Sequence, residues 1–576
     1  MKSSNELRNI LRSIDRKSYP AYKSLAGFYD FDSFTLFIDH VQGDPFASPS
    51  AFHVEIPHGS AGFPEAYYKR TCSRIALQDF LTRRLASSFE DYNFKAKGSG
   101  KSGLLSITRC GQTVLERSAC EITDTKIIVR FHIGLPAFGR TINAGEAEKI
   151  LFDFLPYCVE KSLYYKKTNK SELEAVVFLS EDQDYLRKLL REEKLIAFVA
   201  NGSILPRKSG VSDLPLDDSI PFTSPSSMER TFTLPHYGEI TGMAVPQGIT
   251  LIVGGGYHGK STLLLALQNG VYNHIAGDGR EYVITEDTAV KLRAEDGRSI
   301  RNVDISLFIN ALPNKKDTSS FSTPDASGST SQAAGVVENM EAGSRLLLID
   351  EDTSATNFMV RDDFMQQVIS RNKEPITPFL ERARELYEKE EISTILVAGS
   401  SGAFFFIADK ILQMDSYRPV DITDHVKALC MERTAPRIYG ENYAAPDFKR
   451  AFSACKRRPD SHSLQKKNNS DKGGRNEHMK IKTISRDAFS IDKETVDLRY
   501  VEQLTDFEQT AALAHLLGYG LKQLADGSHT VRQTVHILYE LLDKKGWAPF
   551  CGAYIPCGLA KPREQEIFAC LNRYRG

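Results

Sequence analysis

Residues 251–267 read LIVGGGYHGKSTLLLAL, and this stretch limits what the rest of the chain can be. It contains the pattern G-x-x-x-x-G-K-[ST], which forms a loop around a phosphate group. An apolar run at 249–253 precedes the loop, and leucines spaced for one face of a helix follow it. The order of strand, loop and helix predicts a nucleotide-binding P-loop rather than an ordinary glycine-rich turn. The residues that fit the pattern are Gly254, Gly259, Lys260 and Ser261.

The chemistry of such a loop assigns roles to its residues. Backbone N–H groups of the turn point inward at an anion, and the N-terminus of the following helix adds positive potential. Lys260 supplies a point charge, and the hydroxyl of Ser261 can ligate Mg²⁺. We therefore expect ATP with Mg²⁺ as the bound cofactors. The residues expected to contact ATP are Gly254, Gly255, Gly256, Tyr257, His258, Gly259, Lys260, Ser261 and Thr262.

A second motif lies about ninety residues further on, where the apolar run 346–349 ends in Asp350 and Glu351. Such a run predicts a buried parallel strand. Asp350 at its end can hold Mg²⁺, and Glu351 can polarise the attacking water. By itself the run fits a buried strand with a solvated acidic turn, but the P-loop upstream favours phosphoryl transfer. We expect Glu351 and Lys260 as catalytic residues and Ser261 and Asp350 as metal ligands.

Residues 350–357, DEDTSATN, resemble the D-E-P-T-S-A-L-D stretch of ATP-binding-cassette (ABC) ATPases. That resemblance implies a signature segment shortly before the strand, with the core Ser-Gly-Gly-Gln. Ser327, Gly328 and Ser329 occupy its place, at the spacing common in the family, ahead of a helix expected to begin near Gln332. Small residues at a helix N-terminus suit a γ-phosphate. The alternative is a flexible Ser-rich linker.

Further stretches of the chain resemble one family in particular, the soluble family described as predicted ATPases of the ABC class. The stretches that carry it are IVGGGYHGKSTLL, GDGREYVITEDTAV, VDISLFINALP, DASGSTSQAA, LLLIDEDTSATNFMVRD, FIDHVQGDPFASPS and IDKETVDLRYVEQL. The resemblance implies an N-terminal α/β domain, a central ABC ATPase and a small C-terminal domain. It also implies work on nucleic acid, with RNA favoured.

The chain departs from the general ABC pattern in three places. The switch histidine is missing, and Gly399 or Ser400 stands where it should follow the predicted strand 394–397. The Q-loop glutamine is also missing, with Asp304 as its expected substitute. The signature carries Ser329 and Thr330 in place of Gly and Gln. These changes affect the expected rate of ATP hydrolysis more than the expected binding of ATP. The aromatic residues considered for stacking on adenine are Phe232 and Tyr237.

The fold class expected for the chain is α/β. It consists of a P-loop ABC-type ATPase core, an N-terminal α+β domain and a small, mainly helical C-terminal domain. The expected ranges are 1–165 for the N-terminal domain, 166–445 for the ATPase domain, 446–482 for a partly disordered basic linker and 483–576 for the C-terminal domain.

Two local patterns in the first half of the chain need interpretation. Residues 98–102, GSGKS, look like half a P-loop, but Lys95 stands where the first glycine should be. A strand-like run at 104–108 follows, so we expect a hairpin loop, with phosphate or nucleic-acid contact as the weaker alternative. Farther on, 174–180 reads as a strand and 182–193 as a helix.

Composition limits the functional class. The chain has 576 residues and a net charge of -1, with no apolar run of the roughly 18 residues that a membrane helix needs. Nine scattered cysteines form no C-x-x-C pair, which suits a reducing cytoplasm. Charge is segregated, because residues 449–482 hold eleven Lys or Arg against three acids. Such a tether suits phosphate backbones, although it also suits a soluble spacer.

These observations lead to a functional hypothesis and its alternatives. ABC signatures act on the P-loop of a partner, and this chain has one of each, so the resemblance implies a homodimer that closes over two ATP molecules. Closure would be coupled to nucleic acid, bound through Lys449–Lys482 and the C-terminal domain. The alternative is a nucleotide-dependent scaffold with slow or no turnover. The ATPase subunit of a transporter is disfavoured by the large extra domains.

Overall fold

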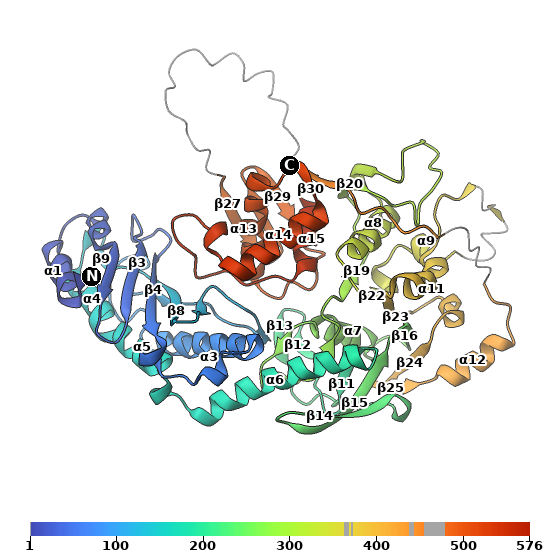
Figure 1. Cartoon of the computed structure of the whole chain (residues 1–576), viewed down its shortest axis with the longest axis horizontal. Helices are drawn as coiled ribbons and strands as arrows, with labels where there is room; N and C mark the ends of the chain where they lie inside the picture. The colour runs from blue at the N-terminus through green and yellow to red at the C-terminus, as the bar shows by residue number, and fades with distance from the viewer. Residues whose placement is uncertain (1, 362–367, 370–372, 437–442, 454–478) are drawn as a thin grey trace, which may run out of the picture.

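The computed structural model describes residues 2–361, 368–369, 373–436, 443–453 and 479–576. Figure 1 shows the N-terminal elements at one end of the molecule, the P-loop core at the other, and the C-terminal helices between them. Most of the predicted linker, residues 454–478, lies outside the described residues, so its expected disorder stays a prediction.

The N-terminal domain is built on a sheet of the order β1-β2-β3-β4-β8-β5, with β7 also paired to β8. Helix α3 (Thr71–Glu90) packs against it and buries Leu77, Leu81 and Leu85, which the spacing of four places on one face. The predicted α+β class is confirmed. The strands are β1 (Lys2–Ser3), β2 (Gly27–Asp30), β3 (Thr35–His40), β4 (Ser50–Pro57), β5 (Leu105–Ser106), β7 (Cys120–Ile122) and β8 (Lys126–Ile133).

The GSGKS stretch forms a tight loop that joins α3 to β5, not two strands of a hairpin. Its N–H groups are used inside the protein: Ser99 N donates to Ala137 O at 2.7 Å, and Lys101 N donates to Pro45 O at 2.8 Å. A phosphate loop needs such groups free and pointing at the anion. This loop is therefore built for packing, and it is not a second P-loop.

The predicted strand at 174–180 is wrong, because helix α6 (Lys170–Glu192) runs through it. Val176, Val177 and Phe178 have the β propensity that suggested a strand. The decisive pattern is the burial of Leu173, Val177 and Ser180, whose spacing places them on one helix face toward α3. The long helix α6 connects the two ends of the molecule (Figure 1).

The P-loop core is a sheet of the order β19-β22-β23-β16-β24-β25. The first five strands are parallel, and β25 is antiparallel to β24. Ligands of such sheets bind at the carboxyl ends of the strands, which here share one edge. The predicted ABC-type α/β core is confirmed. The strands are β16 (Ile249–Val253), β19 (Val290–Leu292), β22 (Leu346–Asp350), β23 (Ser393–Val397), β24 (Lys410–Asp415) and β25 (Arg418–Asp421).

A second, antiparallel sheet lies beside the core, in the order β14-β15-β11-β18. Its inner face packs on α7 (Lys260–Asn269), the helix that follows the P-loop: Val199, Leu263 and Leu267 belong to one buried cluster. This sheet therefore supports the P-loop helix from the side opposite β16. Its strands are β11 (Leu195–Ala200), β14 (Glu229–Leu234), β15 (Gly238–Pro246) and β18 (Val283–Thr285).

The C-terminal domain has a small three-stranded sheet followed by three helices. The sheet buries Phe489, Ile491 and Val496 against the helices. The helices at 507–523 and 531–545 agree with the mainly helical domain that the sequence predicts. The elements are β27 (Ile481–Ser485), β28 (Ala488–Ile491), β29 (Glu494–Asp497), α13 (Phe507–Gln523), α14 (Val531–Lys545) and α15 (Glu564–Arg573).

A buried arginine ties the N-terminal domain to the C-terminal domain. The side chain of Arg117 is 2% exposed and makes 2.7 Å ion pairs with Asp506 and Glu508. We expect Arg117→Met to lower the free energy of unfolding by about 3–5 kcal/mol, because two partly buried carboxylates lose their cation. Thermal unfolding followed by circular dichroism measures this loss.

An exposed arginine provides the control for that prediction. Arg12, whose side chain is 62% exposed, pairs with Glu148, and Arg12→Met should leave the free energy of unfolding nearly unchanged, because solvent screens an exposed pair. Equal losses in the two variants would contradict a specific role for the buried pair.

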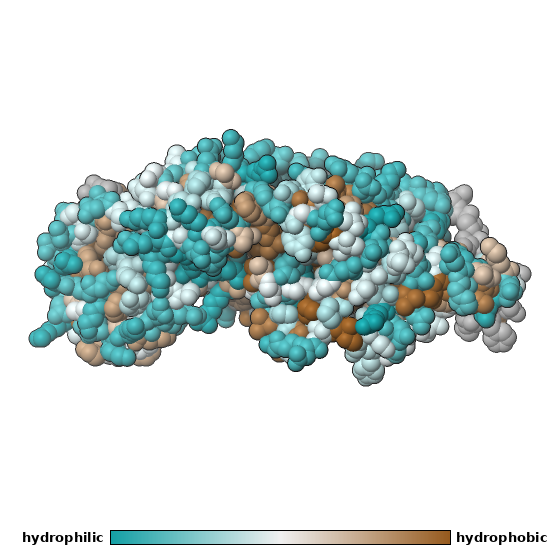
Figure 2. Space-filling view, turned by 90° about the horizontal axis from the view of Figure 1, so that it is seen from below, coloured by the Kyte–Doolittle hydropathy of each residue, from teal (hydrophilic) through white to brown (hydrophobic). Residues whose placement is uncertain are grey.

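In the described residues no helix is long and apolar enough to cross a membrane. The face in Figure 2 is mainly hydrophilic, with hydrophobic side chains gathered toward the half that carries the P-loop core. The eight cysteines in the described part of the chain are all free.

Candidate nucleotide site

The P-loop leaves the carboxyl end of β16, a central strand of the core sheet, and runs into α7. Two of its glycines are required by geometry. Gly254 has φ +138°, and a Cβ there would lie 2.5 Å from Met414 O. Gly259 has φ +97°, and a Cβ would lie 2.9 Å from the ring of Tyr417. Only glycine fits both positions, so the loop keeps its N–H groups close to the strand end.

Lys260 is the first residue of α7, and its ammonium group lies within the loop. Nζ donates to Gly254 O and Gly255 O at 2.8 Å each, which holds the charge at the turn. Two residues of the loop differ in how their side chains are held. The side chain of Tyr257 is 99% exposed, and His258 Nδ1 accepts from Ser416 N at 2.9 Å.

Glu351 stands just past the end of β22 and is held by the loop after β23. Its Oε2 accepts from Gly399 N at 2.6 Å and from Ser400 N at 2.9 Å, and Oε1 accepts from Ser400 Oγ. Burial raises the pKa of this carboxyl, but the hydrogen bonds from Ser400 and Gly399 outweigh it and hold the pKa below its usual value. The loop in the place of the switch histidine therefore contacts Glu351 directly.

This contact makes Ser400 a test of the role of Glu351. We expect Ser400→Ala to raise the pKa of Glu351, because one hydrogen bond to the charged form is lost. Turnover that needs the carboxylate falls as pH drops through this pKa, so the acid limb of the kcat profile should move to higher pH. A pH–rate profile with ATP measures the shift.

The neighbouring serine is the matched control. Ser401 caps the turn that follows, through Oγ to Ala403 N, so Ser401→Ala removes a hydroxyl without touching a side-chain bond to Glu351. Its acid limb should stay where the wild type has it. If the acid limb of the kcat profile does not move in Ser400→Ala, the ionisation of Glu351 does not control the reaction.

The side chains near the strand ends fit a magnesium ion. Asp350 is 8% exposed at the end of β22, with Oδ1 accepting from Asp352 N, and Ser261 is exposed in the first turn of α7. Within the described ranges, no group of three or more His, Cys, Asp or Glu side chains forms a metal site. Mg²⁺ usually takes one or two protein ligands and completes its shell with phosphate oxygens and water. Asp350 and Ser261 would hold it in that way.

The signature segment caps helix α8 (Gly328–Glu341), which begins four residues earlier than expected. Ser327 is exposed and accepts from Thr330 N as the N-cap. Ser329 is buried, and its hydroxyl donates to Asn357 Oδ1. Gln332 adds two bonds to the same segment, through Ser354 Oγ and Ala355 N, both at 2.9 Å. The α8 N-terminus is thus locked to the residues after Glu351, with Ser327 turned outward.

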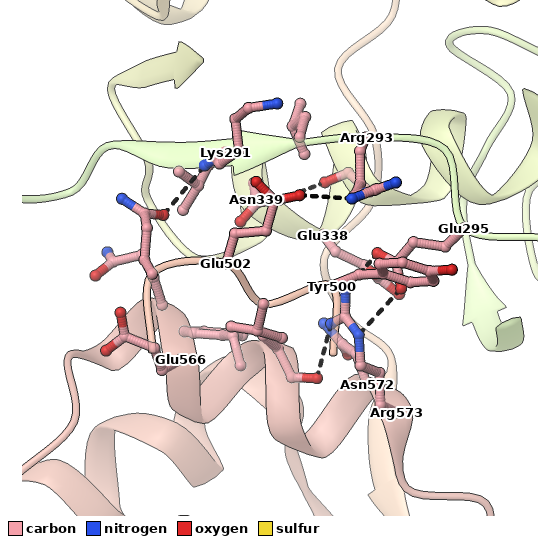
Figure 3. Close-up of a pocket in the computed structure, with 18 of the residues that line it drawn as sticks. Lys291, Arg293, Glu295, Glu338, Asn339, Tyr500, Glu502, Glu566, Asn572 and Arg573 are labelled. Atoms are coloured by element: carbon pink, nitrogen blue, oxygen red, sulfur yellow. Dashed lines mark hydrogen bonds and ion pairs between the residues drawn. The ribbon is translucent and has the colours of Figure 1, made fainter. Parts of the chain in front are cut away.

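Asp304, the expected Q-loop substitute, closes a turn: its Oδ1 accepts from Ser306 N, at 3.0 Å. Strand β19 lies beside β22 in the sheet. Arg293, the residue that follows β19, donates to Glu502 of the C-terminal domain at 2.7 Å (Figure 3). The sequence did not reveal this, because β-sheet order is not a local property.

Neither aromatic residue considered for adenine lies at the P-loop. Phe232 packs edge-on against Phe198 in the second sheet, and Tyr237 packs on Tyr282. A cavity of about 360 Å³ instead opens beside Gly259, with walls from the segment 205–222. No motif marked that segment, because its composition reads as a loop.

The fold and the site together define a P-loop nucleotide-binding protein, with a phosphate loop, an acidic pair and a capped signature helix on one parallel core. Three family models match successive parts of the chain, and their descriptions give the class more closely. They are "ATPase of the ABC class N-terminal" at residues 4–166, the ABC ATPase "P-loop domain" at 169–447 and "MRB1590 C-terminal domain" at 480–576. The chain belongs to the ABC-class ATPases.

One curated protein matches part of the chain. The uncharacterized protein MJ1628 of Methanocaldococcus jannaschii is 31% identical over 251 residues, which cover 41% of this chain and 54% of that protein. The chain thus spans about half the length of this curated relative.

Two solved structures match part of the chain at low similarity. CbiO1 from Clostridium perfringens, part of the ABC transporter complex CbiONQ, is 12% identical with a TM-score of 0.24, covering 41% of this chain and 91% of its own. The ADP conformation of MJ1267, an ATP-binding cassette of an ABC transporter, is 12% identical with a TM-score of 0.25, covering 43% and 99%. Similarity at this level says nothing about function.

Proposed function

We propose that the protein hydrolyses ATP, with Mg²⁺, at a site completed by a second copy of the chain. The observation that carries this proposal is the ionised carboxylate of Glu351, held at the same sheet edge as the P-loop. Lys260 and the loop N–H groups hold the phosphates, and Ser261 and Asp350 place the metal ion. Glu351 positions the attacking water. Phosphoryl transfer needs these elements and little other chemistry from the protein.

The need for a second copy is supported by where the signature points. The side chains of Ser327 and Ser329 bond to Thr330 and Asn357 in their own chain, and the described contacts do not take them to the P-loop. Ser327 at the exposed N-terminus of α8 keeps helix N–H groups available to an anion from outside. A head-to-tail homodimer brings that N-terminus to the partner's γ-phosphate, which gives two composite sites.

We further propose that closure is coupled to nucleic acid, with RNA favoured, in the cytoplasm. The basic segment 449–482 supports this. Of its described cations, Lys449 and Arg450 pair with Asp447 and Glu341, while Lys480 and Lys482 are exposed at the start of the C-terminal domain. The cations of residues 456–475 lie outside the described residues.

The experiment is ATP turnover, with and without RNA, single-stranded DNA and duplex DNA, together with binding at several salt concentrations. We expect RNA to stimulate turnover, and affinity to fall with salt as counterions are released. No stimulation and no salt-dependent binding with any polymer would reject the nucleic-acid part.

A nucleotide-dependent scaffold is the second candidate. The observation that favours it is the set of bonds from Gly399 and Ser400, which occupy both oxygens of Glu351. A carboxylate held in this way positions water only after the loop moves. Binding of ATP with no measurable turnover, under every condition above, would favour the scaffold.

A further inference from the structure

The C-terminal domain lies against the outer edge of the core sheet. In the described structure β19 is an edge strand of that sheet, with β22 on its inner side. An edge strand presents N–H and C=O groups that no neighbouring strand pairs. Residues 500–503 of the C-terminal domain contact this edge, and Figure 3 shows Glu502 facing Arg293 there. The edge of the core sheet is therefore completed by another domain.

The side chain of Gln503 pairs with this edge as a neighbouring strand would. Its Oε1 accepts from Lys291 N at 3.1 Å, and its Nε2 donates to Ala289 O at 3.0 Å. The same Nε2 donates to Gln268 O, near the end of the P-loop helix α7, at 3.1 Å. A primary amide both donates and accepts, whereas a carboxylate only accepts and an apolar side chain does neither. Glutamine therefore matches the groups that the edge offers.

The contact is buried on both sides. Gln503 is 4% exposed and Gln268 is 3% exposed, and Gln268 Nε2 returns a bond to Glu502 O at 2.9 Å. Ala289 O also accepts from Arg563 Nη1 at 3.0 Å, so it keeps a partner if Gln503 is changed. The N–H of Lys291 would lose the partner described here, and a buried polar group without a partner is costly. The backbone of β19 is thus tied to the amide of Gln503.

The end of β19 is in turn bonded to the turn Glu351–Thr353. Ala294 N donates to Thr353 O at 3.0 Å, and Lys291 Nζ donates to Thr353 Oγ1 at 3.4 Å. Thr353 Oγ1 itself donates to Asp350 O at 3.2 Å. The residue is therefore held from β19 through both its backbone and its side chain. A shift of β19 would move this turn.

An ion pair fastens the loop after β19 to the same C-terminal segment. Arg293 donates to Glu502 at 2.7 Å, and its guanidinium lies 4.4 Å from the centre of the Tyr500 ring. The two side chains of the pair are 26% and 25% exposed, so solvent screens part of their attraction. The buried amide of Gln503 is therefore the stricter constraint on β19.

We propose that Gln503 is a positioning residue for ATP hydrolysis, which sets the place of β19 and, through Thr353, that of the turn with Glu351. The inference rests on the proposed function, because it assumes that Glu351 positions the attacking water. A small displacement of such a group slows the chemical step more than it weakens ground-state binding. The C-terminal domain thus acts on the rate of hydrolysis through β19.

The experiment measures ATP turnover and the calorimetric binding of Mg-ATP on the full chain. Gln503→Leu removes the amide and keeps a side chain of similar size. We expect kcat to fall about 10-fold to 100-fold, the cost of a small misplacement at the reacting group, while ATP affinity stays within about 2-fold of the wild type. Gln503→Asn keeps the amide on a shorter side chain and should recover part of kcat. If circular dichroism shows that Gln503→Leu does not fold, Gln503→Asn decides by the same criteria.

A double variant tests the path through Thr353. Thr353→Val removes the hydroxyl that accepts from Lys291 Nζ, and it should also lower kcat. Gln503→Leu/Thr353→Val should then lose less than the product of the two single losses, because residues that act through one another are not additive. A loss equal to that product would overturn the path.

Gln533→Leu is the matched control, because Gln533 is exposed on α14 and its side chain accepts from Thr530 N within the C-terminal domain. It should keep the kcat and the ATP affinity of the wild type. Wild-type kcat in Gln503→Leu, or equal losses of kcat and ATP affinity, would overturn the inference. The proposed function would still stand if Glu351→Gln is inactive. If the wild type does not hydrolyse ATP, the proposed function itself is overturned.

Discussion

Glu351→Gln should lower the kcat for ATP about 10²-fold to 10³-fold while ATP binding is kept, the size of effect seen when one preorganised catalytic contact is removed. The amide keeps the shape of the side chain but loses the charge that polarises the attacking water. It also keeps one oxygen to accept from Gly399 and Ser400, so the loop after β23 should stay in place. Phosphate release at saturating ATP and calorimetric ATP binding measure the two quantities.

The control for this prediction removes a charge of the same kind elsewhere in the core. Glu388 is exposed on α11 (Phe379–Glu390), so Glu388→Gln should turn over ATP as the wild type does. A Glu351→Gln protein that keeps wild-type turnover would refute the catalytic role assigned to Glu351. Loss of binding together with turnover would show a structural role instead.

Mixing two inactive variants should restore ATP hydrolysis if the site is shared between chains. Lys260→Ala removes the positive charge that holds the phosphates in the P-loop half of the site. Ser327→Arg blocks the signature segment, which forms the other half. A mixed dimer then has one site with both defects and one site with none. Random pairing makes half of the dimers mixed, so an equimolar mixture should show roughly a quarter of wild-type turnover.

A second mixture provides the matched control. Lys260 and Glu351 belong to the same half-site, so a mixture of Lys260→Ala with Glu351→Gln leaves every site defective and should stay inactive. Recovery in the first mixture and not in the second identifies a composite site. A Ser327→Arg protein that is active by itself, or no recovery in the first mixture, would contradict it.

The C-terminal domain contacts both the helix that follows the P-loop and the helix that carries the signature segment. Gln503 donates to Gln268 O, at the end of the P-loop helix, and to Ala289 O, just before β19. Arg532 donates to Glu341 O at the end of α8. The domain therefore bridges the P-loop side and the signature side of the core. A movement of one side relative to the other would strain or break these hydrogen bonds.

Local patterns in the sequence predicted the chemical elements of the site. The P-loop, the acidic pair and the signature are short runs whose function depends on neighbours in the chain, so they can be recognised without a fold. The parallel core followed from apolar runs that end in those motifs. The error at 174–180 arose because β-branched residues outweighed the helical spacing of Leu173, Val177 and Ser180.

Contacts between distant segments were decided only by the tertiary structure. Sheet order places β19 beside β22, and Arg293, just after β19, pairs with Glu502 of the C-terminal domain. The bonds from Ser400 to Glu351 join residues 49 positions apart. The sequence by itself determined that the chain carries a P-loop, because glycines, a lysine and a hydroxyl at fixed spacing define that loop. What surrounds the loop is determined by packing, which brings together residues that no local pattern connects.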